Sequence, residues 1–173
     1  MRKLLAICLC LILCCSFSAC LMLDTDEPRK EQGSGETPSG SKDETYGLND
    51  SAVFKDLKFT ANEIKESDGD TFLEPDAGKV YVGVKFTVEN ISDEEQSVSS
   101  LLLFEAYADD VKCDYSFGAM SAFGDGTLDG SIQPGKKLVG WYAVEVSQDW
   151  KTIEIQIQPS WLSSNPANFV FTK

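Results

Sequence analysis

The sequence contains no histidine, and only one of its six cysteines lies beyond residue 20. Without an imidazole, histidine-based catalytic triads, histidine-ligated zinc and ordinary imidazole acid–base chemistry are all excluded. The body of the chain holds only Cys113, so it cannot form an internal disulfide framework. We expect Cys113 to act as a small buried hydrophobic residue rather than as a nucleophile.

Basic residues are also scarce: the chain has 15 Lys and Arg against 28 Asp and Glu, a net charge of −13. Two of the 15, Arg2 and Lys3, precede Cys20, which leaves 13 against 28 and a net charge of −15 for residues 20–173. A surface this negative repels phosphate backbones and anionic lipid headgroups. We therefore expect no nucleic-acid partner, and any membrane attachment should use a covalent or inserted anchor.

Residues 1–19 have the three parts of an export signal peptide. Arg2 and Lys3 form a positive end, Leu4–Cys15 is an unbroken apolar run, and small residues follow up to Ala19. An uncleaved transmembrane anchor is the alternative, because Leu4–Leu23 is long enough to cross a bilayer.

The segment Phe17–Cys20 resembles the lipobox of bacterial lipoproteins, with Phe17 where leucine is usual. The resemblance implies that Cys20 is diacylated on its sulfur and becomes the new N-terminus after cleavage. It also implies that the protein lies at the extracytoplasmic face of the cell membrane, held by this lipid. Two acyl chains give stable attachment, whereas one alone does not.

Residues 20–45 read as the lipidated cysteine followed by a flexible, disordered linker. Prolines, glycines, serines and mixed charges leave little apolar surface to bury. Such a coil spans roughly 25–30 Å on average, so we expect it to hold the domain away from the membrane.

Residues 46–173 are predicted to fold as an all-β, antiparallel sandwich. The strongest signal is Lys79–Asn90, in which Val80, Val82, Val84, Phe86 and Val88 alternate with other residues. Such a strand buries one face and exposes the other, so its sheet needs a second layer. The further strands are expected at 52–54, 57–61, 101–108, 111–115, 128–132, 137–146, 153–157 and 168–172.

Local signals refine this outline. In the strand that starts at Leu57, the apolar residues change from odd to even positions before Ile64. A β-bulge near Asn62-Glu63 accounts for this change. Asp109-Asp110 suits a two-residue hairpin turn. Residues 116–126 are expected to form a long loop pinned by apolar side chains, and no segment predicts a convincing helix.

Residues 82–100 and 125–155 resemble the domains of unknown function found on many lipoproteins of Gram-positive bacteria. The resemblance is carried by Glu89-Asn90, Asp125–Leu128, Pro134–Lys137 and the glycine–aromatic strand at Gly140. It implies an immunoglobulin-like sandwich akin to that of a secreted mycobacterial antigen. These motifs are turns and core strands, so they indicate a fold and supply no catalytic residue.

Acidic residues around Gly69 form a weak candidate calcium site, comprising Asp68, Asp70, Glu74 and Asp76. Their spacing lacks the Asp-x-Asp-x-Asp-Gly pattern, and a solvated acidic turn is the favoured interpretation. We expect no metal and no cofactor.

Three aromatic residues are candidate ligand contacts: Trp161, Trp150 and Tyr115. Flat rings bind flat sugars, but aromatic side chains also fill sandwich cores. Trp161 is the best candidate, because it lies in the non-periodic segment 160–167.

The sequence therefore predicts a non-catalytic binding or interaction module on a surface lipoprotein, facing a cell-wall glycan or an envelope protein. Two alternatives stay open: a small envelope hydrolase or metal-dependent enzyme, and an accessory or sensing subunit of an envelope complex. Paired carboxylates do not favour the enzyme, since among 28 acidic residues some pair falls at a suitable separation by chance.

Overall fold

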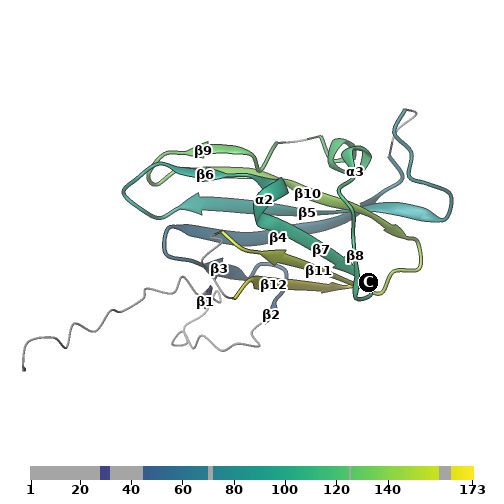
Figure 1. The fold of residues 1–173 in the computed structure, drawn as a ribbon, viewed down its shortest axis with the longest axis horizontal. Helices are drawn as coiled ribbons and strands as arrows, with labels where there is room; N and C mark the ends of the chain where they lie inside the picture. The colour runs from purple at the N-terminus through teal and green to yellow at the C-terminus, as the bar shows by residue number, and fades with distance from the viewer. Residues whose placement is uncertain (1–27, 32–44, 70–71, 125, 160–164) are drawn as a thin grey trace, which may run out of the picture.

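The computed structural model describes residues 28–31, 45–69, 72–124, 126–159 and 165–173. These residues form two packed five-stranded sheets and a separate two-stranded ribbon (Figure 1). The first sheet has the order β1 (Arg29–Glu31), β3 (Ser51–Val53), β4 (Leu57–Ser67), β5 (Lys79–Asn90), β10 (Lys137–Ser147). The second has the order β2 (Thr45–Tyr46), β12 (Ala167–Thr172), β11 (Thr152–Ile157), β7 (Phe104–Ala108), β8 (Val111–Lys112). The ribbon pairs β6 (Gln96–Val98) with β9 (Gly130–Ile132). The predicted all-β sandwich is confirmed.

Strand β5 has the predicted bounds and the predicted inward face. Its five alternating apolar residues, from Val80 to Val88, are at most 4% exposed. Phe86 lies at the centre of the core, with its ring centroid 5.5 Å from that of Phe104 and 5.2 Å from that of Phe169. Both partners belong to the second sheet, so this cluster joins the two layers. The predicted bulge is also present, as a register shift between Ala61 and Glu63.

The outer face of β5 is not fully exposed, contrary to expectation. Tyr81 is only 3% exposed, because helix α3 (Phe117–Ala122) packs over it. The sequence predicted a loop here and no helix, and both expectations are wrong. The side chain of Ser116 caps the helix by accepting a hydrogen bond from the Ala119 N–H at 3.1 Å.

The hairpin between β7 and β8 is confirmed. Asp109 and Asp110 have φ values of 47° and 67°, the left-handed geometry that a type I′ turn requires. The flanking strands are shorter than predicted. Residues 101–103 belong to the short helix α2 (Ser100–Leu103) instead of a strand, and β8 ends at Lys112.

Two short strands lie at or inside the predicted linker. Arg29–Glu31 pairs antiparallel with Ser51–Val53, and Thr45-Tyr46 pairs in parallel with Asn168-Phe169. Residues 29–31 therefore cover β3, which the sequence predicted as an edge strand. Residues 1–27, with Cys20, and 32–44 lie outside the described part of the chain. Within the described part, no helix combines the length and apolar character needed to cross a bilayer.

Candidate functional site

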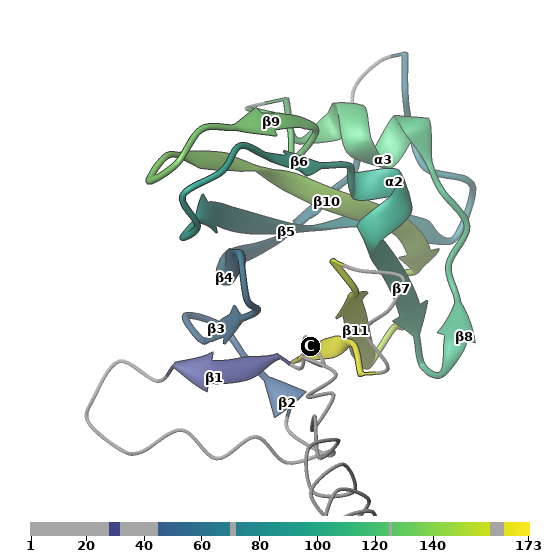
Figure 2. The ribbon, with the colours of Figure 1, turned by 60° about the vertical axis from the view of Figure 1, so that its left-hand side comes forward.

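A cleft of about 720 Å³ opens at one side of the sandwich. We call it the edge cleft. Residues 111–117, which comprise β8, the segment after it and the first residue of α3, form one wall. Glu145–Ser147 of β10 forms the other. Trp150 lines its inner end. Figure 2 shows that the two walls come from different layers, with α3 above them.

The wall formed by residues 111–117 carries three large apolar side chains that face solvent. Val111, Tyr115 and Phe117 are 69%, 58% and 68% exposed. Single exposed apolar residues are common, but several on one short segment beside a cavity are typical of interaction sites. We call these three residues the apolar rim.

The sequence identified only one member of the apolar rim, Tyr115. Val111 and Phe117 were not singled out. Val111 was assigned to a hairpin strand, and Phe117 was counted among the side chains that pin a loop. Val111 and Tyr115 have the same parity along the extended part of this wall, whereas Phe117 begins helix α3, so no single period in the sequence groups the three. Parity does not reveal whether such a face meets the core or solvent.

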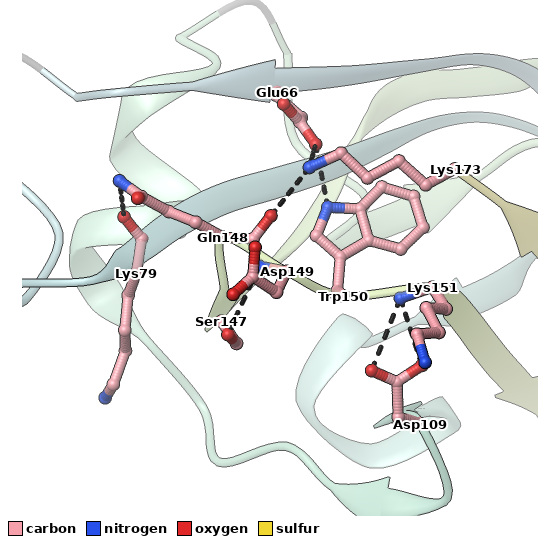
Figure 3. Close-up of polar contacts among 9 residues, drawn as sticks. All are labelled: Glu66, Lys79, Asp109, Ser147, Gln148, Asp149, Trp150, Lys151 and Lys173. Atoms are coloured by element: carbon pink, nitrogen blue, oxygen red, sulfur yellow. Dashed lines mark hydrogen bonds and ion pairs between the residues drawn. The ribbon is translucent and has the colours of Figure 1, made fainter.

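Trp150 was predicted as a ligand contact, but its side chain is only 4% exposed. Its indole Nε1 donates a hydrogen bond to Glu66 Oε1 at 2.7 Å, and Lys173 Nζ lies 5.3 Å from the ring centroid (Figure 3). The ring fills space between the two sheets, where its apolar surface is buried. It therefore closes the inner end of the edge cleft and offers no exposed platform.

Three carboxylates line the edge cleft: Asp114, which is exposed, and Asp109 and Glu145, which both accept backbone hydrogen bonds. Asp109 accepts hydrogen bonds from the backbone N–H groups of Lys151 and Thr152, at 3.0 and 2.9 Å. Glu145 accepts one from the Asp76 N–H at 2.8 Å and lies 3.6 Å from Lys79 Nζ. Both groups thus hold loops in place.

The basic groups at this site are paired as well. Lys112 Nζ lies 2.8 Å from Glu105 Oε1. Its hydrogen bond raises the pKa of Lys112 and lowers the pKa of Glu105. The pKa of Lys79 is raised, first by its hydrogen bond to Asp76 and then by the charge of Glu145. These lysines are therefore charged at neutral pH, and each already has an acidic neighbour.

Cys113 also lines the edge cleft and is half-buried. Burial raises the pKa of its thiol, which keeps it protonated and weakly nucleophilic at neutral pH. The residue packs against the core, as predicted, although less deeply.

The acidic residues that were a weak candidate for a calcium site are not brought together in the described residues. Asp76 pairs with Lys79 at 3.0 Å, and Asp70 and Trp161 lie outside the described ranges. Within those ranges no group of three or more acidic or cysteine side chains is placed to hold a metal ion.

The described residues form a mostly antiparallel β-sandwich that is open at one side, at the edge cleft. The model of a family described as Domain of unknown function (DUF4352) matches residues 46–167, and the chain belongs to that family. The predicted kinship with domains of unknown function is thereby confirmed. No curated protein matches the sequence.

Several solved structures share the fold. The ycdA protein of Bacillus subtilis, described as a candidate lipoprotein, superposes with a TM-score of 0.57 at 12% identity, over 78% of this chain but only 39% of its own. The yjhA protein of B. subtilis gives 0.57 at 13% identity, over 74% of this chain and 99% of its own. A candidate lipoprotein of Staphylococcus aureus gives 0.51 at 16% identity, over 70% and 87%. At these identities the likeness shows the fold alone.

Proposed function

We propose that this protein is a lipid-anchored, non-catalytic binding module at the extracytoplasmic face of the membrane, and that it holds its partner at the edge cleft. In this proposal the sandwich is immunoglobulin-like, akin to the secreted mycobacterial antigen. The proposal rests on the apolar rim, in which Val111, Tyr115 and Phe117 are exposed to solvent beside a cavity. Binding a partner would bury that apolar surface, which stabilises a complex by about 25 cal/mol for each Å² removed from water.

The proposed anchor is the lipid on Cys20. It is supported by the lipobox-like segment Phe17–Cys20 after an apolar run. Cys20→Ser should accumulate as an unprocessed precursor that takes up no alkyne-palmitate label, while Cys15→Ser should be processed and labelled normally. Normal labelling of Cys20→Ser would refute the lipoprotein assignment.

A non-catalytic role is supported by the engagement of two of the three carboxylates that line the edge cleft, the third being the exposed Asp114. Asp109 and Glu145 both accept backbone hydrogen bonds, so neither is free to act on a substrate without releasing a loop. The proposed partner is an envelope component, either a wall glycan or a protein. Aromatic rims suit both.

Crosslinking on intact cells tests the binding site. A photoreactive amino acid replaces Tyr115 in the full-length chain, and the control replaces exposed Asp93, which follows the far end of β5. Both positions should be equally accessible to a small reagent. We expect discrete crosslinked products at Tyr115 that are missing at Asp93. Identical products at both positions, or none at either, would contradict the proposed site.

A further inference from the structure

We propose that the partner bound at the edge cleft is an extended, basic peptide segment of another envelope protein, added as a strand to the open edge of β8. This inference rests on the proposed function and narrows it, because it selects one class of partner and one mode of binding.

The first support is the unpaired edge of the second sheet. In the described residues that sheet ends at β8, which has β7 on one side and no strand on the other. Val111 pairs with Ala108 next to the turn, and the Cys113 N–H donates to Ala106 O at 2.8 Å. Since backbone groups alternate in direction along an antiparallel strand, those of Lys112 and Asp114 point away from β7. Such an edge is a template for another strand.

The facing wall of the edge cleft is also a sheet edge. In the described residues the first sheet ends at β10. The Ala143 N–H points outward and donates to Met120 Sδ of α3 at 3.3 Å, so α3 covers the edge there. Two residues further on, the Glu145 N–H points the same way, and Glu145 is one of the residues that line the edge cleft. The cleft therefore offers main-chain hydrogen-bonding groups on both walls.

This arrangement favours a peptide over a glycan. The backbone of an added strand can form hydrogen bonds to the outward N–H and C=O groups, because its own groups have the same regular spacing. A sugar has no such regular series of donors and acceptors. The apolar rim then receives alternate side chains of the added strand. Val111 and Tyr115 occupy alternate positions on one face of the wall. They can therefore contact an added strand whose apolar residues also alternate.

Charge selects a basic partner. Lys112 and Lys79 are already paired with Glu105 and Asp76, at 2.8 and 3.0 Å. Asp110 and Asp114 are exposed on the same hairpin and its extension. Among the described residues neither forms a direct ion pair, although the charge of Asp114 helps to raise the pKa of the neighbouring Lys112. The whole chain carries a net charge of −13. An acidic peptide would be repelled, and a basic one steered toward this edge.

The test uses the full-length protein in detergent micelles and a short fluorescent peptide of alternating lysine and valine, followed by anisotropy. Three probes serve as controls: the same peptide N-methylated at alternate amides, its glutamate-for-lysine analogue, and a peptidoglycan-derived disaccharide. The N-methylated peptide keeps the charge but cannot pair as a strand. We expect only the unmodified basic peptide to bind, with an affinity that falls as salt rises.

A matched pair of variants tests the edge itself. Lys112→Ala and Lys112→Pro both remove the ion pair to Glu105, but only proline removes the outward N–H. The bonds to β7 are made by the neighbouring residues, so both variants should fold. We expect Lys112→Pro to bind the peptide about fivefold more weakly than Lys112→Ala, the effect of one lost hydrogen bond. Asp114→Asn should weaken binding severalfold and flatten its salt dependence.

The outcomes separate this inference from the function on which it rests. Failure of the basic peptide to bind overturns the inference, as does equal binding of the N-methylated peptide or equal affinity of the two Lys112 variants. If the disaccharide binds instead, the inference fails and the binding module stands. If no probe binds and crosslinking through Tyr115 captures nothing, both fail together.

Discussion

The indole Nε1 of Trp150 donates a hydrogen bond to Glu66 Oε1 at 2.7 Å. Glu66 lies near the end of β4 in the first sheet, and Trp150 lies just before β11 in the second. Lys173 Nζ contacts the same carboxylate oxygen at 2.8 Å. This three-residue contact joins the two layers (Figure 3), and Trp150 also lines the edge cleft.

Replacing Trp150 separates the hydrogen bond from the packing of the ring. Trp150→Phe removes the donor but keeps most of the apolar volume, so we expect it to lower the free energy of unfolding by about 1–2 kcal/mol. Trp150→Ala also leaves a cavity and should cost about 3–5 kcal/mol. Urea unfolding of the full-length chain, followed by circular dichroism, measures both. Equal losses for the two variants would show that the ring does not fill the interlayer space.

The same contact predicts a pH dependence. The hydrogen bond from Lys173 is the main cause of a lowered pKa for Glu66 in the folded state. A lowered carboxyl pKa stabilises the fold above the unfolded value, near 4.5, and that stabilisation is lost as the pH falls through the folded value. The side chain of Glu66 is 42% exposed, so solvent screening limits the effect to less than about 1 kcal/mol.

Glu66→Gln tests this, because glutamine still accepts from Trp150 but does not titrate. We expect wild type to be more stable than Glu66→Gln at pH 7 and the difference to vanish near pH 3. Lys173→Gln is the matched control and should show the same loss at pH 7 without adding to that of Glu66→Gln. A difference that persists at pH 3 would rule out the ion pair as its cause.

Features of the fold that depend on local pattern were predictable from the sequence. The alternation of β5 is sustained over many residues, so a slip by one position would expose every valine. The bulge at Ala61 follows from a parity change within one strand. The Asp109-Asp110 turn follows from two residues that tolerate left-handed geometry.

What escaped prediction depends on contacts between distant residues. Helix α3 is six residues long, too short to show a helical period, and it is held by packing on Tyr81 and Ala143. Strand β1 forms only because β3, twenty residues later, offers an edge. Trp150 and Tyr115 are both aromatic, and only the folded arrangement makes one a core residue and the other a rim residue.

Asn90 is fully buried, and both the nitrogen and the oxygen of its side-chain amide form hydrogen bonds. Its Nδ2 donates to the carbonyl oxygens of Glu94 and Ile132 at 2.7 and 2.8 Å, and its Oδ1 accepts from the Ser92 N–H at 2.9 Å. Asn90→Asp places a carboxylate against two carbonyl oxygens, so we expect it to cost about 3 kcal/mol or more at pH 7.

The control for this prediction is the pH of the measurement. At pH 3 an aspartic acid at position 90 is protonated and can donate to one of the two carbonyls, so the cost of Asn90→Asp should fall. Asn90→Ala removes both functions and should show no comparable recovery on acidification. Urea midpoints at pH 7 and pH 3 give the comparison. Equal costs for Asn90→Asp at both pH values would show that the charge is not responsible.

The last prediction contrasts two glycines on neighbouring strands, Gly140 of β10 and Gly83 of β5. A Cβ at Gly140 would lie 2.6 Å from the backbone carbonyl carbon of Thr127, so the segment before β9 would have to move away from the sheet. A Cβ at Gly83 would lie 2.8 Å from the ring of Phe123, which is a side chain and can rotate. That ring stacks on Trp141 with centroids 5.0 Å apart.

We therefore expect Gly140→Ala to lower the free energy of unfolding by about 2–3 kcal/mol, as overpacking against a backbone does. Gly83→Ala should cost less than about 1 kcal/mol, because alanine restricts the unfolded chain more than glycine does. Since Phe123 must leave Trp141, Gly83→Ala should nevertheless change the near-ultraviolet circular dichroism of the tryptophans. If the order of the two losses were reversed, the close approach of residues 127 and 140 would not be what fixes the glycine in β10.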